Sequence, residues 1–419
     1  MRKRDNIIAN TDWFTVLLYL ILVIAGWFTI YSASFDNPDA SMFDITQRFG
    51  KQAMWIGLAL LLAVTIMIID AKFFSAFAFW IYLLVMLVLI GVLLFGKTVA
   101  GSKSWFQIGS FAIQPAEFAK FATALALARY LGKLNININE LKTKLRAIAI
   151  IMLPSVLILL QNDTGSALVY FSFILVLYRE GFSGIFIVLG LVTGTLFVLT
   201  LLFGKLYLIA GMAIITVLGI WLSRKLRKNA KTVVGIFILA SLFVFSVNYA
   251  FEEVLQPHQR NRIKVLLGMM HDPRGVGYNV NQSKIAIGSG GLTGKGFKQG
   301  MLTRYHFVPE QSTDFIFCTM GEEGGFIGSS LLVLTFMILL IRLVLLAERQ
   351  RSAFSRIYGY GVASVLFFHF MVNIGMTIGL MPVVGIPLPF FSYGGSSLWA
   401  FTILLFIFIK QDANRLNVL

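Results

Sequence analysis

One acidic residue stands where a long polar stretch gives way to an apolar one. Asp314 lies in the segment Pro309–Phe315, and the residues that follow it are hydrophobic enough to enter a membrane. A carboxylate at the mouth of a membrane helix costs free energy, so such residues usually serve a function. A positioned carboxylate can take up a proton from a reacting group, which is the chemistry considered first for Asp314.

Two further carboxylates follow Asp314 at a spacing that separates them from it. Glu322 and Glu323 come eight and nine residues later, or about 12 Å further along an α-helix. At roughly 100° per residue, they lie about 80° and about 180° round the helix from Asp314. The three cannot share one site, and we expect a structural role for at least one glutamate.

A glutamate and a lysine share a helical face in the segment Gln114–Lys120. Pro115 suits a first helical turn, where its missing N–H costs nothing. Glu117 is favoured by the helix dipole, and Lys120, three residues later, can pair with it. Two interpretations stay open: an ion pair that joins two helices, or a polar wall of a water-filled cavity.

Other cations stand where an anionic group could bind. Arg48 and Lys51 precede an apolar run, and Lys284 and Lys295 belong to a glycine-rich stretch. For Arg48, snorkelling of the charge to the membrane surface and contact with a phosphate are both open. The block Gln161–Gly165 contains an aspartate, Asp163, for which a helix N-cap is a sufficient explanation.

Motifs of hydrolases and zinc enzymes are absent from the sequence. It contains no H-E-x-x-H, no C-x-x-C and no serine-nucleophile elbow. The single cysteine, Cys318, lies in an apolar run and is expected to be inert. The four histidines lack metal-ligand spacing: His258, His271, His306 and His369.

The composition indicates a membrane protein. Of the 419 residues, 58% are hydrophobic and 13% are charged, about half the charged fraction of a soluble protein. Twelve apolar stretches approach the roughly 20 residues that a helix needs to span a bilayer, and spanning segments of this kind must be helical. They lie near 13–31, 53–69, 75–95, 113–131, 147–161, 165–179, 184–203, 206–222, 233–250, 315–341, 355–380 and 395–410. The predicted fold is an all-α polytopic helical bundle, residues 1–419, in one membrane domain.

Alternate loops between these stretches are basic, which orients the bundle. They hold 20 of the 35 basic residues and six acidic ones, and so carry +14 of the formal charge of +16. Positively charged loops stay in the cytoplasm, so we expect both termini there, including Arg2–Asp5. This distribution favours contact with anionic lipid and argues against a nucleic-acid partner.

The opposite, outer side then holds one long loop, residues 251–314. Its centre, Gly288–Gly296, is dense in glycine. Consecutive N–H groups there could form an anion-binding nest, although a flexible solvated loop explains the composition equally well. A second irregular segment, Val383–Ser397, contains two prolines and a Gly pair, and at this depth it must be buried in protein or line a cavity.

Several blocks together resemble the SEDS family (shape, elongation, division and sporulation) of bacterial membrane proteins, in family order. The blocks are Gln114–Lys120, Asp272-Pro273 to Tyr278, Gln282–Gly291, Pro309–Phe317 with Gly321–Gly324, Asn373–Met376 and Pro382–Ser397. The sequences of these blocks are most similar to those of the rod-shape branch of the family. Family members have ten spans, so residues 183–232 are expected to be an inserted helix pair that brings the count to twelve.

The resemblance implies a peptidoglycan glycosyltransferase that polymerises lipid II at the outer face of the cytoplasmic membrane. It implies a class B penicillin-binding protein as partner, together with other membrane proteins of the elongation complex. Asp314 occupies the position of the essential family aspartate and would be the general base of an inverting displacement. The residues expected to bind substrate are Arg48, Glu117, Lys120, Lys284, Lys295 and Ser396.

No dedicated metal site is evident, and a divalent cation such as Mg²⁺ or Mn²⁺ is an optional cofactor. A lipid flippase or transporter is one alternative function, because polar groups within spans and a broken helix also suit that class. A scaffold that only docks a penicillin-binding protein is another. Clustering of the polar groups at one end of the bundle favours the enzyme.

Overall fold

The computed structural model describes residues 7–34, 41–99, 101–109, 111–133, 136–138, 140–254, 257–267, 269 and 277–416. Arg2–Asp5, His271 and the Asp272-Pro273 block therefore lie outside the described residues. The chain divides into two compact units, the first formed by Met1–Phe182 with Asn279–Leu419 and the second by Ser183–Tyr278. The second unit contains the expected insertion, 183–232, and extends beyond it.

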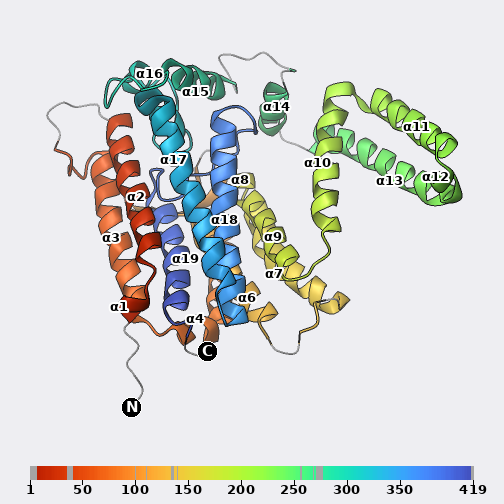
Figure 1. Ribbon diagram of the computed structural model, residues 1–419. Helices are drawn as coiled ribbons and strands as arrows, with labels where there is room; N and C mark the ends of the chain where they lie inside the picture. Colours follow the sequence, from red (N-terminus) through yellow and green to blue (C-terminus); the bar gives the residue numbers. More distant parts are fainter. Residues whose placement is uncertain are drawn as a thin grey trace. The chain divides into compact units, whose positions relative to one another are not determined.

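The first unit is a helical bundle (Figure 1), and it also contains a small sheet. Before residue 183 its elements are α1 (Ile7–Asn10), α2 (Trp13–Ala33), α3 (Arg48–Ile68), α4 (Ala71–Ala76), α5 (Ala78–Phe95), β1 (Lys97–Val99), β2 (Ser102–Ile108), β3 (Phe111–Ile113), α6 (Pro115–Leu131), α7 (Leu141–Leu160), α8 (Thr164–Leu168), the 3-10 turn η1 (Val169–Ser172) and α9 (Phe173–Arg179). The later ones are α15 (Tyr278–Ser289), α16 (Met301–Arg304), α17 (Ile316–Glu348), α18 (Ala353–Thr377) and α19 (Gly395–Ala413).

Helices α6, α18 and α19 form the core of this bundle. Each packs against the other two, and most of their side chains are buried. Helix α6 is rich in alanine, including Ala116, Ala119 and Ala122, which are fully buried. Small side chains let helix backbones approach closely within a membrane, where close packing is a main source of helix association.

In the described part of the chain, ten helices are long and apolar enough to cross a membrane, so the protein is a multi-pass membrane protein. Each of the twelve predicted stretches is helical, but two of them fall short of that length. Helix α6 has 17 residues, and the stretch Thr164–Arg179 is divided by the turn η1. The count of twelve spans is therefore not confirmed.

The second unit is built from three long apolar helices, α10 (Ile185–Phe203), α11 (Lys205–Leu222) and α13 (Ala230–Tyr249). The basic helix α12 (Arg224–Lys228) connects the last two, and the π-helical turn η2 (Ala250–Val254) and α14 (Pro257–Leu266) follow. Within residues 183–232, the structure has two span-length helices, α10 and α11. The long loop predicted at 251–314 holds no span-length helix in its described residues, although α14, α15 and α16 give it regular structure.

The two ends of the first unit differ in structure. Helices α15 and α16 lie over the end at which α17 begins, while α1, α4 and the end of α19 lie at the opposite one (Figure 1). Beside the bundle, β1, β2 and β3 form an antiparallel sheet in that order. The sheet is anchored where Lys103 N–H and Ser102 Oγ both donate to the Gln161 carbonyl, at 2.9 and 3.0 Å.

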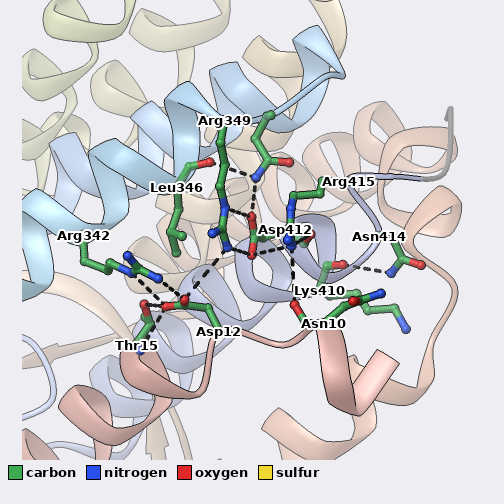
Figure 2. Close-up of polar contacts among 11 residues, drawn as sticks. Asn10, Asp12, Thr15, Arg342, Leu346, Arg349, Lys410, Asp412, Asn414 and Arg415 are labelled. Carbon is green, nitrogen blue, oxygen red and sulfur yellow. Dashed lines mark hydrogen bonds and ion pairs between the residues drawn. The ribbon is translucent and has the colours of Figure 1, made fainter. Parts of the chain in front are cut away.

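Carboxylates and arginines fasten the ends of α2, α17 and α19 together (Figure 2). Asp412, which is fully buried, accepts a hydrogen bond of 2.8 Å from Arg349 Nε and one of 2.7 Å from Gln350 Nε2. Asp12 accepts from Arg342 Nε at 3.2 Å, and Arg349 Nη2 lies 3.9 Å from the same carboxylate. A buried carboxylate is tolerable here because several donors replace its water.

Removal of the buried carboxylate should weaken this junction. We expect Asp412→Ala to lower the free energy of unfolding by about 2–3 kcal/mol, because it removes the buried acceptor that Arg349 and Gln350 share. Thermal unfolding in detergent measures the change. Glu348→Ala is the control, since Glu348 forms an exposed pair with Arg179 and should shift the midpoint little. Equal shifts for the two variants would contradict the prediction.

Asp12 should make the stability depend on pH. Burial raises the pKa of this carboxyl, but the hydrogen bonds from Arg342 and Thr15 outweigh burial and leave the pKa below its usual value. The stability it contributes is therefore present above the unfolded-chain pKa of about 3.9 and disappears as the pH falls through the folded-state value. Melting curves should show Asp12→Asn less stable than wild type at neutral pH, with a difference that shrinks below about pH 4. A constant difference would contradict this.

Candidate functional site

Asp314 lies in a tight turn just before α17. The N–H groups of Thr313 and Phe315 both donate to the Glu310 carbonyl, at 3.1 and 3.2 Å, and Glu310 itself adopts a positive φ of 57°. Phe315 is the N-cap of α17, and the helix begins at Ile316. The sequence predicted a helical stretch from residue 315, so Asp314 lies one residue further from the helix than expected. The aspartate is half-buried.

The irregular segment between α18 and α19 holds this turn in place. Ser392 Oγ donates to the Thr313 carbonyl at 2.6 Å, and Tyr393 N–H donates to the Ser312 carbonyl at 2.9 Å. These bonds provide hydrogen-bond donors for the Thr313 and Ser312 carbonyls, which lie outside any helix or sheet. The expectation that Val383–Ser397 is buried in protein is confirmed, because most of its side chains are buried or half-buried.

Asn373, on α18, connects the same two segments from the other side. Its Nδ2 donates to the Asp314 carbonyl and to the Ile386 carbonyl, each at 2.8 Å, and the side chain is fully buried. The neighbouring Gly385 has a φ of 73°, and a Cβ there would lie 3.3 Å from Asp314 Oδ2. The aspartate carboxylate therefore faces backbone of the irregular segment.

Arg48, the first residue of α3, brings a cation to this place. Its Nη1 donates to Ser312 Oγ at 2.8 Å, and its guanidinium carbon lies 5.9 Å from the ring centre of Tyr393. Burial raises the pKa of Tyr393, an effect that the Arg48 charge partly offsets, so the phenol is neutral at physiological pH. Arg48 thus lies beside the segment that carries Asp314, as expected for a residue of the same site.

Glu117 and Lys120 form the predicted ion pair, with 2.7 Å between Oε2 and Nζ. Their exposed fractions are only 3% and 1%, so neither lies at a solvent-filled wall. The ammonium also lies 4.7 Å from the ring centre of Phe401 on α19. Both residues lie on α6, so the ion pair itself is within one helix, and a direct contact with substrate stays a prediction.

Other predicted site residues are distributed around the bundle. Ser396 Oγ accepts from Gln114 N–H at 3.2 Å and lies at the start of α19. Lys284, on α15, is exposed and packs against Gly379, whose Cβ would lie 3.1 Å from the lysine Nζ. Lys295 forms an ion pair of 2.7 Å with Glu322. Of these three, none has a hydrogen bond or ion pair to Asp314 among the interactions described.

Glu322 has the packing role expected for one of the glutamates. It is fully buried and accepts from Leu302 N–H at 3.0 Å, from Thr303 N–H at 2.9 Å and from Thr303 Oγ1 at 2.8 Å. With the Lys295 ion pair, these bonds use both carboxylate oxygens. Glu322 therefore joins α17 to the start of α16 and is separate from Asp314.

The glycine-rich stretch packs on α17, and its N–H groups are not arranged as an anion nest. Lys295 N–H donates to the Glu322 carbonyl and Gly296 N–H to the Glu323 carbonyl, at 3.0 and 3.1 Å. A Cβ at Gly294 would lie 2.0 Å from the Glu323 carbonyl oxygen. The prediction of an anion-binding nest is wrong at these positions, because the N–H groups are already bonded to carbonyls of α17. The absence of a side chain at Gly294 allows the backbone of the stretch to approach the backbone of α17.

Helix α17 is interrupted at Gly325, where φ is 62° and ψ is −158°. The glycine-rich stretch completes the interrupted hydrogen bonding. Phe326 N–H donates to the Gly291 carbonyl at 2.9 Å and Ile327 N–H to the Leu292 carbonyl at 3.1 Å. The glycine-rich stretch thus donates hydrogen bonds to α17 carbonyls that precede Gly325 and accepts hydrogen bonds from α17 N–H groups that follow it.

No group of three or more His, Cys, Asp or Glu side chains in the described part of the chain could hold a metal ion. Asp163 caps α8 as expected, since its carboxylate accepts from Ser166 N–H at 3.0 Å. Its other oxygen accepts from Gln114 Nε2 at 2.8 Å.

Sequence reasoning gave no site role to three residues. Ser312 and Tyr393 lie inside the family blocks Pro309–Phe317 and Pro382–Ser397 but carry no charge, and the contact of Ser312 with Arg48 joins positions 264 residues apart. Asn373 could have been found, because an amide in the apolar stretch of α18 needs partners for its polar atoms. Its Oδ1 is buried and has no partner among the described atoms.

The chain matches the family model for FtsW, RodA and SpoVE, described as "Cell cycle protein", over residues 12–216 and 194–416. It is 33% identical to "Peptidoglycan glycosyltransferase RodA" of Treponema pallidum, with 98% of this chain and 99% of that protein covered. It is 31% identical to "Peptidoglycan glycosyltransferase MrdB" of Escherichia coli K12, with 94% and 93% covered.

Solved structures share the fold. A chain from "Structural coordination of polymerization and crosslinking by a peptidoglycan synthase complex" is 30% identical, with a TM-score of 0.70 and coverage of 97% of this chain and 99% of that one. The rod shape determining protein RodA of Thermus thermophilus is 25% identical, with a TM-score of 0.63 and coverage of 97% and 98%.

Substitution of Gly294 should test the packing of the glycine-rich stretch. Its φ is 79° and the added Cβ would collide with the Glu323 carbonyl, so Gly294→Ala should lower the free energy of unfolding by about 2 kcal/mol or more. Gly288→Ala is the matched control, because no atom lies within 4 Å of its Cβ position. Thermal unfolding of both variants gives the comparison, and an unchanged Gly294→Ala would rule out this packing role.

Proposed function

Since this chain belongs to the FtsW, RodA and SpoVE family of cell cycle proteins, we propose that it is a peptidoglycan glycosyltransferase that polymerises lipid II into glycan strands. The relatives named RodA and MrdB carry that activity in their names, and they align with this chain over nearly its whole length. The observation that carries the proposal is the half-buried Asp314 beside the Arg48 cation, on backbone held by Asn373 and Ser392.

Asp314 acts as the general base in this proposal. The reaction joins an acceptor sugar hydroxyl to the anomeric carbon of a donor that leaves as undecaprenyl pyrophosphate. An α-linked donor that gives a β-linked glycan requires inversion, and a single displacement requires one base and no carboxylate nucleophile. The O–H bond of the acceptor breaks, its proton moves to Asp314, and the pyrophosphate departs with the electron pair of the C–O bond.

Cations of the site balance the charge of the leaving group. Arg48 contacts Ser312, two residues before Asp314, and would hold one phosphate while the acceptor hydroxyl faces the base. Lys120 contributes positive potential from within the bundle, where its pairing with Glu117 fixes its position. Lys284, Lys295 and Ser396 are further candidates for substrate binding. Mg²⁺ or Mn²⁺ is given no step, because the described residues contain no ligand set for it.

The site faces the outside of the cytoplasmic membrane in this proposal. The support is the charge distribution, because the basic loops stay in the cytoplasm and Asp314 lies at the opposite end of the spans. A class B penicillin-binding protein is the expected partner, and other membrane proteins of the elongation complex would join it. The support is the similarity to a chain of a complex that coordinates polymerization and crosslinking.

Replacement of the base should abolish polymerisation. We expect Asp314→Asn, purified with a partner penicillin-binding protein, to lose about 10²-fold or more of its activity on lipid II, because the amide cannot take up the acceptor proton. Gel analysis of glycan chains from labelled lipid II gives the rate. Glu310→Gln serves as the matched control, since Glu310 is exposed and lies in the same turn; this variant should keep nearly all activity.

The outcomes separate the proposed functions. A wild-type rate for Asp314→Asn would rule out the aspartate as base. Lack of glycan chains from the wild-type complex would rule out the polymerase and favour the scaffold. Movement of labelled lipid II across a vesicle bilayer without polymerisation would favour the flippase or transporter.

A further inference from the structure

Lys120 has a third neighbour besides Glu117 and Phe401. Its Nζ lies 3.0 Å from Nε2 of His369, a residue of α18. The histidine is fully buried, and its ring packs edge-on against Phe401 at a centroid distance of 4.8 Å. A buried histidine with polar contacts at both nitrogens is not explained by the reaction steps above.

The contacts of His369 determine which nitrogen carries the proton. Nδ1 lies 3.1 Å from the Pro387 carbonyl oxygen, and a carbonyl oxygen can only accept a hydrogen bond. Nδ1 is therefore protonated. Nε2 faces an ammonium, which can only donate, so Nε2 carries a lone pair. His369 is a neutral imidazole that accepts from Lys120 and donates to Pro387.

Asn373 repeats this arrangement one helical turn later. Residues four apart lie on one face of a helix, so His369 and Asn373 point toward the same segment. They bind two consecutive carbonyls, Pro387 and Ile386. Each side chain then contacts a second group: His369 contacts the Lys120 ammonium, and Asn373 contacts the Asp314 backbone at 2.8 Å.

We propose that His369 is a positioning residue that links the Glu117–Lys120 ion pair to the backbone beside Asp314. The inference rests on the proposed glycosyltransferase function. His369 holds the Lys120 ammonium at a fixed distance from the Ile386–Pro387 backbone, and Asn373 holds Asp314 against that same backbone. The cation and the base then keep one relative position while substrate enters and polymer leaves.

Steady-state kinetics on lipid II test this role in the complex with a partner penicillin-binding protein. His369→Met keeps an apolar side chain of similar length but neither accepts from Lys120 nor donates to Pro387. We expect its kcat to fall about tenfold, with KM changed less than about threefold, because a misplaced group affects the transition state more than binding. His369→Gln can still donate and accept, and it should recover kcat to within about threefold of wild type.

Two controls complete the experiment. Ser355→Ala removes another buried hydrogen bond of α18, from Ser355 Oγ to Gln411 Oε1 at 3.1 Å, and should leave kcat unchanged. Melting temperatures of all variants are measured in the same preparations, and both His369 variants should stay folded at the assay temperature.

Each result decides a specific claim. A wild-type kcat for His369→Met overturns the positioning role, and so does a His369→Gln variant as slow as His369→Met. Unfolding of His369→Met at the assay temperature makes the residue structural and also overturns it. An inactive wild-type complex rejects the proposed function itself, whereas an active wild type with slow His369→Met and recovered His369→Gln supports both.

Discussion

Every backbone N–H and C=O of a membrane-spanning bundle needs a partner from the protein, because hydrocarbon supplies none. Two stretches of this protein cannot pair their backbone groups within a regular helix. They are the segment between α18 and α19 and the interruption of α17 at Gly325. In the first, the side chains of Asn373, His369 and Ser392 bond to the backbone of residues 386–388. The second is satisfied by the backbone of the glycine-rich stretch.

The same bonds fix the geometry of the site. The turn that carries Asp314 is not part of a helix or strand, so its position depends on hydrogen bonds from Asn373, Ser392 and Tyr393. Arg48 reaches this turn through Ser312, on which it depends for its orientation. Residues that make irregular backbone possible in a membrane therefore also hold the turn of Asp314 beside the Arg48 cation.

Local patterns were the predictable part of this protein. Apolar length predicted every long helix, and spacing predicted the Glu117–Lys120 pair and the Asp163 cap. Contacts between distant segments were not predictable in this way. Lys295 pairs with Glu322, 27 residues away, and Lys120 meets His369, 249 residues away. The glycines of 290–296 fitted a nest, a flexible loop and a backbone contact equally well until the partner, α17, was known.

The exchange of hydrogen bonds at Gly325 bears on how the chain enters the membrane. The glycine-rich stretch precedes α17 in the sequence and is synthesised first. The N–H groups of Phe326 and Ile327 bond to carbonyls of that stretch, so this part of α17 cannot reach its final hydrogen bonding before the stretch lies against it. Docking of the glycine-rich stretch and completion of the helix are thereby one assembly step.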